Sequence, residues 1–82
     1  MQKELDQLEQ QLNQRIYNLF KVKFDGNKSA FARASHCRES TIRRLFRNEQ
    51  GITINLLLRI ANALDVTAEE LLKDIKYSDK DV

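Results

Sequence analysis

Apolar side chains recur every three or four residues along almost the whole chain, and this spacing restricts the fold more than any other feature of the sequence. In the first 24 residues the series is Leu5, Leu8, Leu12, Ile16, Leu19, Phe20 and Phe24. A helix brings residues at this spacing to one side, so the pattern predicts amphipathic helices that pack on one another. Proline is absent and only two glycines occur, which favours helix further. The sequence therefore predicts an all-α fold.

Capping and turn residues divide this pattern into separate helices. The first is expected over residues 1–24 and ends before Gly26, which can take the left-handed conformation that terminates helices. Asn27 can cap a second helix over about residues 28–35, and a third is expected over about residues 39–47. The first three helices are thus predicted from local signals alone.

Two further helices follow. Asn48 is the expected terminator of the third helix, because asparagine tolerates the left-handed conformation. Thr53 caps a fourth helix, whose apolar residues are expected at the centre of the core: Ile54, Leu57, Leu58, Ile60, Ala61 and Leu64. Thr67 and Glu70 form a capping box that opens a fifth helix. Its apolar residues are Leu71, Leu72 and Ile75, and residues 77–82 form a charged tail.

The length and composition exclude several classes of protein. With 82 residues the chain makes one small domain. One cysteine cannot form an internal disulfide, and no Cys/His cluster offers four ligands to zinc, so neither a metal nor another cofactor is expected. No apolar run approaches the roughly 20 residues that span a bilayer, and no signal-peptide pattern occurs. We therefore expect a soluble, cytoplasmic protein, with no membrane partner and no evident small-molecule substrate.

Positive charge is concentrated in one part of the chain. The formal net charge of the whole sequence is +2, whereas residues 28–47 alone carry +5. Residues 48–82 carry −3 and residues 1–12 carry −2. A local excess of this kind suits an anionic partner that binds one face of the molecule.

The only histidine and the only cysteine are neighbours, His36 and Cys37, inside the basic segment. Adjacent residues in a tight turn project in different directions, so a hydrogen-bonded nucleophile and base is not expected. An unpaired cysteine usually behaves as a small buried apolar residue. We therefore interpret this pair as the turn between the second and third helices, and we do not expect an enzyme.

Two short helices joined by three or four residues, the second with arginines on its outer side, are the minimum of a helix-turn-helix. The segment FARASHCRESTIRRLFRN resembles the motif of Cro and phage-repressor proteins, the XRE family, and GITINLLLRIANALDVTAEELL resembles the helices that follow it. The resemblance covers residues 12–73. It implies a five-helix, lambda-repressor-like DNA-binding domain, here with an extended N-terminal helix. His36 stands where that family usually has glycine, so a positive φ is expected there.

The resemblance also implies which residues meet DNA, because the third helix of such a motif enters the major groove. Five residues are predicted to lie nearest the base edges: Arg38, Glu39, Ser40, Arg43 and Arg44. Arg43 is the candidate for a bidentate contact to guanine, and Glu39 either accepts from cytosine or orients Arg43. Five others are predicted to hold phosphates: Lys28, Arg33, Arg47, Thr53 and Asn55.

Two functions remain open on this basis. The leading hypothesis is sequence-specific binding of double-stranded DNA by a transcriptional regulator. The alternative is a protein-interaction module of the antitoxin or adaptor type that uses the same helical fold. The exposed basic helix favours the first hypothesis, since a purely protein-binding module does not require it.

The first helix extends further than the domain needs, which suggests a second copy of the chain. We divide the chain into a helical extension (residues 1–11), the DNA-binding domain (12–76) and the tail (77–82). Leu5, Leu8 and Leu12 have heptad spacing, so the extension is a candidate dimerisation segment. A homodimer would present two recognition helices about 34 Å apart to a pseudo-palindromic site. Alternatively, the leucines fold onto their own domain or residues 1–10 fray.

Overall fold

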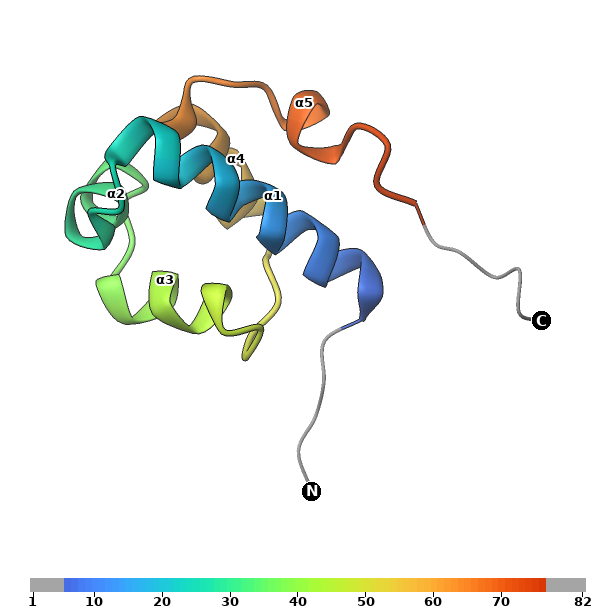
Figure 1. Cartoon of the computed structure of the whole chain (residues 1–82), viewed down its shortest axis with the longest axis horizontal. Coiled ribbons are helices and arrows are strands. Elements are labelled where there is room, and N and C mark those ends of the chain that lie inside the picture. Colours follow the sequence, from blue (N-terminus) through green and yellow to red (C-terminus); the bar gives the residue numbers. More distant parts are fainter. Residues whose placement is uncertain (1–5, 77–82) are drawn as a thin grey trace.

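The computed structural model describes residues 6–76, which form five α-helices and no strand (Figure 1). The helices are α1 (Gln7–Phe24), α2 (Lys28–Ala34), α3 (Glu39–Phe46), α4 (Ile54–Leu64) and α5 (Ala68–Leu72). α1 packs against each of the other four. Within residues 6–76 no helix is long and apolar enough to cross a membrane. The predicted all-α fold and its order of helices are confirmed.

The start of α1 differs from the prediction. Asp6 caps the helix, and its Oδ1 accepts a hydrogen bond from the backbone N–H of Leu8 at 2.8 Å. A carboxylate at this position satisfies one of the amides that have no partner inside the helix. The helix was predicted from residue 1, but α1 begins at Gln7. The prediction was wrong at this end because it followed the spacing of apolar residues, which continues on both sides of Asp6. Leu5 and the tail 77–82 lie outside the described residues.

Left-handed residues end the helices at the expected turns. Gly26 has φ 80°, His36 has φ 56° and Asn48 has φ 59°, as predicted. Asp25 and Asp65 share this conformation, with φ 53° and 61°. Histidine, asparagine and aspartate adopt it more readily than other residues with a side chain, so each turn uses a residue that tolerates it.

The predicted caps are also present. Asn27 accepts from the N–H of Ala30 at 3.0 Å, and Thr53 accepts from that of Leu56 at 3.1 Å. Thr67 and Glu70 form the capping box that opens α5. These bonds fix where α2, α4 and α5 begin.

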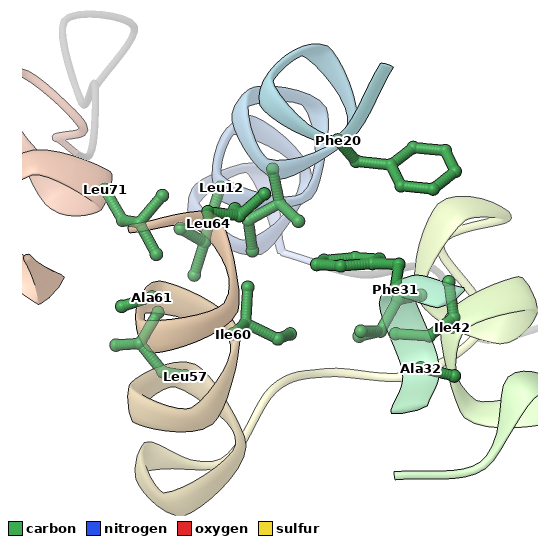
Figure 2. Close-up of a cluster of buried hydrophobic side chains, with 12 residues drawn as sticks. Leu12, Phe20, Phe31, Ala32, Ile42, Leu57, Ile60, Ala61, Leu64 and Leu71 are labelled. Atoms are coloured by element: carbon green, nitrogen blue, oxygen red, sulfur yellow. The ribbon is translucent and has the colours of Figure 1, made fainter. Parts of the chain in front are cut away.

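One cluster of buried side chains joins all five helices of the described chain (Figure 2). Its members are Leu12, Ile16, Phe20, Phe31, Ala32, Ile42, Leu45, Leu57, Ile60, Ala61, Leu64 and Leu71. Phe20 of α1 and Phe31 of α2 are in contact within it, with ring centroids 5.1 Å apart. Both rings are fully buried, so they fix the distance between α1 and α2.

Two apolar residues of α4 were wrongly expected in this core. Ile54 is 73% exposed and Leu58 is 54% exposed, whereas Leu57 and Ile60 are buried. At 100° per residue, positions 54 and 58 fall on a strip beside the buried side of the helix. Hydrophobicity alone placed them in the core, but no other helix of the described chain covers that strip.

The short helix α5 is tied to α1 by a side chain. Arg15 donates from Nη1 to the carbonyl of Leu71 at 3.1 Å and to the carbonyl of Lys73. This contact between α1 and the end of α5 was not foreseen from the sequence. The last carbonyls of a helix have no partner inside it, so a guanidinium placed there stabilises the end. A helix of five residues needs such support.

The turn at His36 generates the first prediction. Replacing His36 by glycine should leave the melting temperature unchanged or raise it, because glycine carries no steric cost at positive φ. The free energy of unfolding should rise by at most about 1 kcal/mol. The side chain of His36 is exposed, so little packing is lost. Thermal denaturation measures the change, and His36→Ala, which keeps the β-carbon, is the control. A clear fall in both variants would show that the imidazole itself stabilises the turn, and would contradict the prediction.

Candidate nucleic-acid interface

The sequence of α3 divides the helix into a buried side and a charged side. Ile42 and Leu45 are buried in the core, with 1% exposure or less. Arg38 at the N-cap, Glu39 and Arg43 are exposed on the other side. Because Ile42 and Leu45 hold the helix by one side, the arginines are directed away from the core.

Helix α2 fixes the position of α3 through a close contact. Ala32 is 3% exposed, and its carbonyl accepts from the backbone N–H of Cys37 at 3.0 Å. A larger residue than alanine would push the two helices apart. In Figure 2, Ala32 and Phe31 of α2 lie beside Ile42 of α3. The predicted pair of short helices joined by a tight turn is confirmed.

A bond from α4 holds the turn between α2 and α3. Arg59 donates from Nη1 to the carbonyl of His36 at 2.9 Å. Sequence reasoning missed this contact, which spans 23 residues, because a basic residue on α4 gives no sign of its partner. The strained turn is thus supported from a third helix, which restricts the angle between α2 and α3.

The Cys37 thiol next to this turn is half-buried against the core. Burial raises its pKa above the ordinary value, and the charge of Arg59 opposes part of that rise. The reactive form of cysteine is the thiolate, which a raised pKa disfavours at neutral pH. Among residues 6–76 no group of three or more His, Cys, Asp and Glu side chains is placed to hold a metal ion. Cys37 therefore serves as part of the packing around the turn.

The exposed side of α3 carries an ion pair one turn long. Glu39 Oε2 and Arg43 Nη1 are 2.9 Å apart, and both side chains are nearly half exposed. This ion pair is the contact that one of the two roles predicted for Glu39, the orientation of Arg43, requires. An exposed pair at this spacing stabilises a helix by only about 0.3 to 0.5 kcal/mol. The pair therefore orients the Arg43 guanidinium, and breaking it to form another contact costs little free energy.

A third residue braces this pair from α2. Ser29 donates from Oγ to the other carboxylate oxygen of Glu39, Oε1, at 3.3 Å. The amino end of α2 is therefore next to the amino end of α3. Ser29 was missed by sequence reasoning, because the contact depends on how the two helices cross.

The carboxyl end of α3 is linked to the loop that follows. Arg44 donates from Nε to Gln50 Oε1 at 2.9 Å. Asn48 Oδ1 accepts from Asn13 Nδ2 at 3.3 Å, which connects the same loop to α1.

Ser40, a further predicted base contact, is half-buried on α3. Arg44 and Ser40 thus lie on the same helix as Arg43, as predicted.

The predicted phosphate contacts are distributed over α2, the carboxyl end of α3 and the amino end of α4. Lys28 begins α2, next to the amino end of α3, and Arg47 follows the last residue of α3. Thr53 caps α4 and Asn55 lies in its first turn, after the loop that leaves α3. Arg33 stands on the last turn of α2, at the opposite end of that helix from Lys28. Lys28 and Arg47 thus lie near the two ends of α3, Thr53 and Asn55 lie at the amino end of α4, and Arg33 lies at the far end of α2.

Residues 23–76 match the family described as Cro/C1-type HTH DNA-binding domain. The chain belongs to this family. The match covers α2 to α5 with the end of α1, and so confirms the resemblance and the lambda-repressor-like fold. It begins at residue 23, whereas the resemblance found in the sequence reached back to residue 12. A comparison with curated proteins gave no match, and neither did a comparison with solved structures.

Membership of the Cro/C1-type family identifies the charged side of α3 as part of a DNA-binding motif. The family has a DNA-binding domain as its defining unit and is generally non-enzymatic. In this fold α2 and α3 are the helix-turn-helix, with α3 as the recognition helix. DNA is therefore the partner that the local positive charge of residues 28–47 suits.

Proposed function

We propose that this chain is a transcriptional regulator, which acts in the cytoplasm and binds a specific sequence of double-stranded DNA as a homodimer. The observation that supports it most is the direction of the α3 arginines. They are exposed opposite Ile42 and Leu45, the two side chains that fix the helix in the core. An α-helix held in this way fits the major groove of B-DNA, where each base pair presents a distinct pattern of donors and acceptors.

Base recognition is assigned to the outer side of α3. Arg43 donates to O6 and N7 of guanine, the most common specific contact of arginine with DNA. Glu39 orients Arg43 from one turn away, with Ser29 behind it. Arg38, Ser40 and Arg44 complete the set of residues that face the bases. Because Arg43 is already directed by Glu39, less side-chain freedom is lost when it meets its base.

Phosphate binding is assigned to the residues at the two ends of α3. Lys28 holds the backbone beside the amino end of α3, and Arg47 holds it beyond the carboxyl end. Thr53 and Asn55 contribute at the amino end of α4, where the helix dipole favours an anion. Arg33 adds a charge at the edge of this surface. Such contacts set the register of α3 in the groove without reading the sequence.

A purely protein-binding role is the competing function. A module of the antitoxin or adaptor type would not need arginines on the outer side of α3, and truncating them would leave its partner bound. Co-elution of the purified chain with nucleic acid, lost at high salt, favours DNA binding. A selection of bound sequences from a random duplex pool then supplies the preferred site.

The first prediction from this function concerns salt. If each protomer contacts about four or five phosphates, the slope of log affinity against log salt should be about −4 per protomer, since each contact contributes about −0.9. Titrations of duplex DNA at several salt concentrations measure the slope. An affinity that does not change with salt would contradict DNA binding through the basic face.

The second prediction separates base contacts from phosphate contacts. Arg43→Ala should cost about 1 to 3 kcal/mol on the preferred site and little on random duplex, because a base contact is specific. Lys28→Ala should weaken binding to both duplexes by about the same amount. Titrations of each variant on the two DNAs give the comparison. Equal losses on both DNAs for Arg43→Ala would make Arg43 a phosphate contact.

A further inference from the structure

The loop that follows α3 reverses the chain and brings Gln50 beside Arg44. Asn48 has φ 59°, and its backbone N–H donates to the carbonyl of Leu45 at 3.0 Å. The N–H of Glu49 donates to the carbonyl of Arg44 at 2.9 Å. This pair of bonds is the usual end of a helix that terminates at a left-handed residue. The next residue along the chain is Gln50, which therefore lies close to Arg44.

Gln50 holds the Arg44 side chain by the nitrogen nearest to its aliphatic stem. Gln50 Oε1 accepts from Arg44 Nε at 2.9 Å. Gln50 is half-buried, whereas Arg44 is exposed on α3. In a guanidinium Nε carries one N–H donor, and each of the two terminal nitrogens carries two. The bond to Gln50 therefore leaves both terminal nitrogens of Arg44 to meet another partner.

Two side chains of α1 hold the loop that carries Gln50. Asn13 is 3% exposed, and its Nδ2 donates to Asn48 Oδ1 at 3.3 Å. The Glu9 carboxylate lies so close to Gly51 that a β-carbon at Gly51 would clash with it. Both side chains precede the part of the chain that matches the family. The backbone of Gln50 is thus in contact with α1 on either side, through Asn48 and Gly51.

We propose that Gln50 is a positioning residue for base recognition, which orients Arg44 so that its two terminal nitrogens donate to O6 and N7 of a guanine. This inference rests on the proposed function, and it adds a second guanine to the one assigned to Arg43. O6 and N7 are neighbouring acceptors in the major groove, and arginine meets them with two parallel N–H bonds. An arginine held at Nε presents the two donors that this contact requires.

Arg44 is held in a different way from Arg43. The bond between Glu39 and Arg43 uses Nη1, one of the two terminal nitrogens, and the carboxylate offsets part of the positive charge. Gln50 is a neutral amide, so it orients Arg44 without reducing the attraction of its charge to DNA. Arg44 therefore keeps both terminal nitrogens and its full charge for the contact with DNA.

An orientation set before binding affects the specific duplex more than other duplexes. A mobile arginine loses rotamer freedom when it forms a fixed contact with one base, and this loss reduces its affinity for that base. Contacts with phosphates set the register of the protein and do not read the sequence. Gln50 is therefore expected to raise the preference for the specific site, with little effect on binding to random duplex.

The first test replaces Gln50 by alanine in the full chain. Competition titrations use duplexes in which each guanine of the selected site is replaced in turn. Gln50→Ala should lower the preference for one of these guanines by about three- to tenfold, the effect of ordering one long side chain. Affinity for random duplex should stay within about twofold, which also shows that the variant is folded.

Gln11→Ala is the matched control for Gln50→Ala. Gln11 is exposed on α1, and its Nε2 donates to the carbonyl of Lys76. The control therefore removes a glutamine that forms a hydrogen bond away from α3. It should keep the full preference at every guanine.

Gln50→Glu separates the orientation of Arg44 from a structural role of the loop. The carboxylate keeps an acceptor for Arg44 Nε, so the preference for the same guanine should be retained. The added negative charge should weaken binding to every duplex by about the same factor, because it repels the phosphates. A preference that falls as far as in Gln50→Ala would show that Gln50 does not act as the acceptor for Arg44.

A double-mutant cycle identifies the arginine on which Gln50 acts. Arg44→Ala should lower the preference for that same guanine by about 10- to 100-fold. In this variant Gln50→Ala should have no further effect, because two residues that act as one unit are not additive. In Arg43→Ala, by contrast, Gln50→Ala should keep its full effect.

Three results would overturn the inference, and they are distinct from failure of the proposed function. A full preference in Gln50→Ala would show that Arg44 needs no orientation. Additive losses for Gln50→Ala and Arg44→Ala would give Gln50 a separate contact with DNA. Loss of preference at the guanine of Arg43 would assign Gln50 to that residue. In each case a preferred duplex still exists, whereas an unchanged chain without a preferred duplex would remove the proposed function and this inference together.

Discussion

The burial of Ile42 and Leu45 is the interaction on which the rest of the structure depends. These two side chains reach from α3 into the cluster built around Phe20 and Phe31. Their positions determine the rotation of α3 about its axis, and so the direction of every arginine on its outer side. A function that depends on an exposed row of charges is therefore set by the shape of the core. Arg59 donates to the carbonyl of His36 in the turn, and this bond restricts the angle between α2 and α3.

Much of the fold followed from the sequence, because its signals are local. A cap such as Thr53, or a left-handed residue such as Asn48, acts within three or four residues of its own position. The positive φ of His36 was predicted from the resemblance instead, because His36 stands where the family usually has glycine. The basic segment 28–47 was visible as charge, and its residues proved to share one helix pair.

Apart from the cap at Asp6, the features that the sequence did not reveal depend on contacts between distant segments. Glu39 had two possible roles, and only the crossing of α2 and α3 brings Ser29 to its carboxylate. Arg15 gave no sign that it would bind the end of α5. Leu58 is as apolar as Leu57, yet only the packing of the other helices decides which of them is covered. The spacing of apolar residues predicts which side of a helix faces the core, but it does not tell how wide a strip of that side the neighbouring helices cover.

The central claim is that α3 reads DNA from the major groove, and methylation interference on the selected duplex tests it most directly. Dimethyl sulfate modifies guanine at N7, which lies in the major groove, and adenine at N3, which lies in the minor groove. The account predicts that methylated guanines block binding in two stretches about 34 Å apart. Adenine methylation between these stretches should have little effect. Interference by adenine N3 alone, or by neither base, would contradict the account.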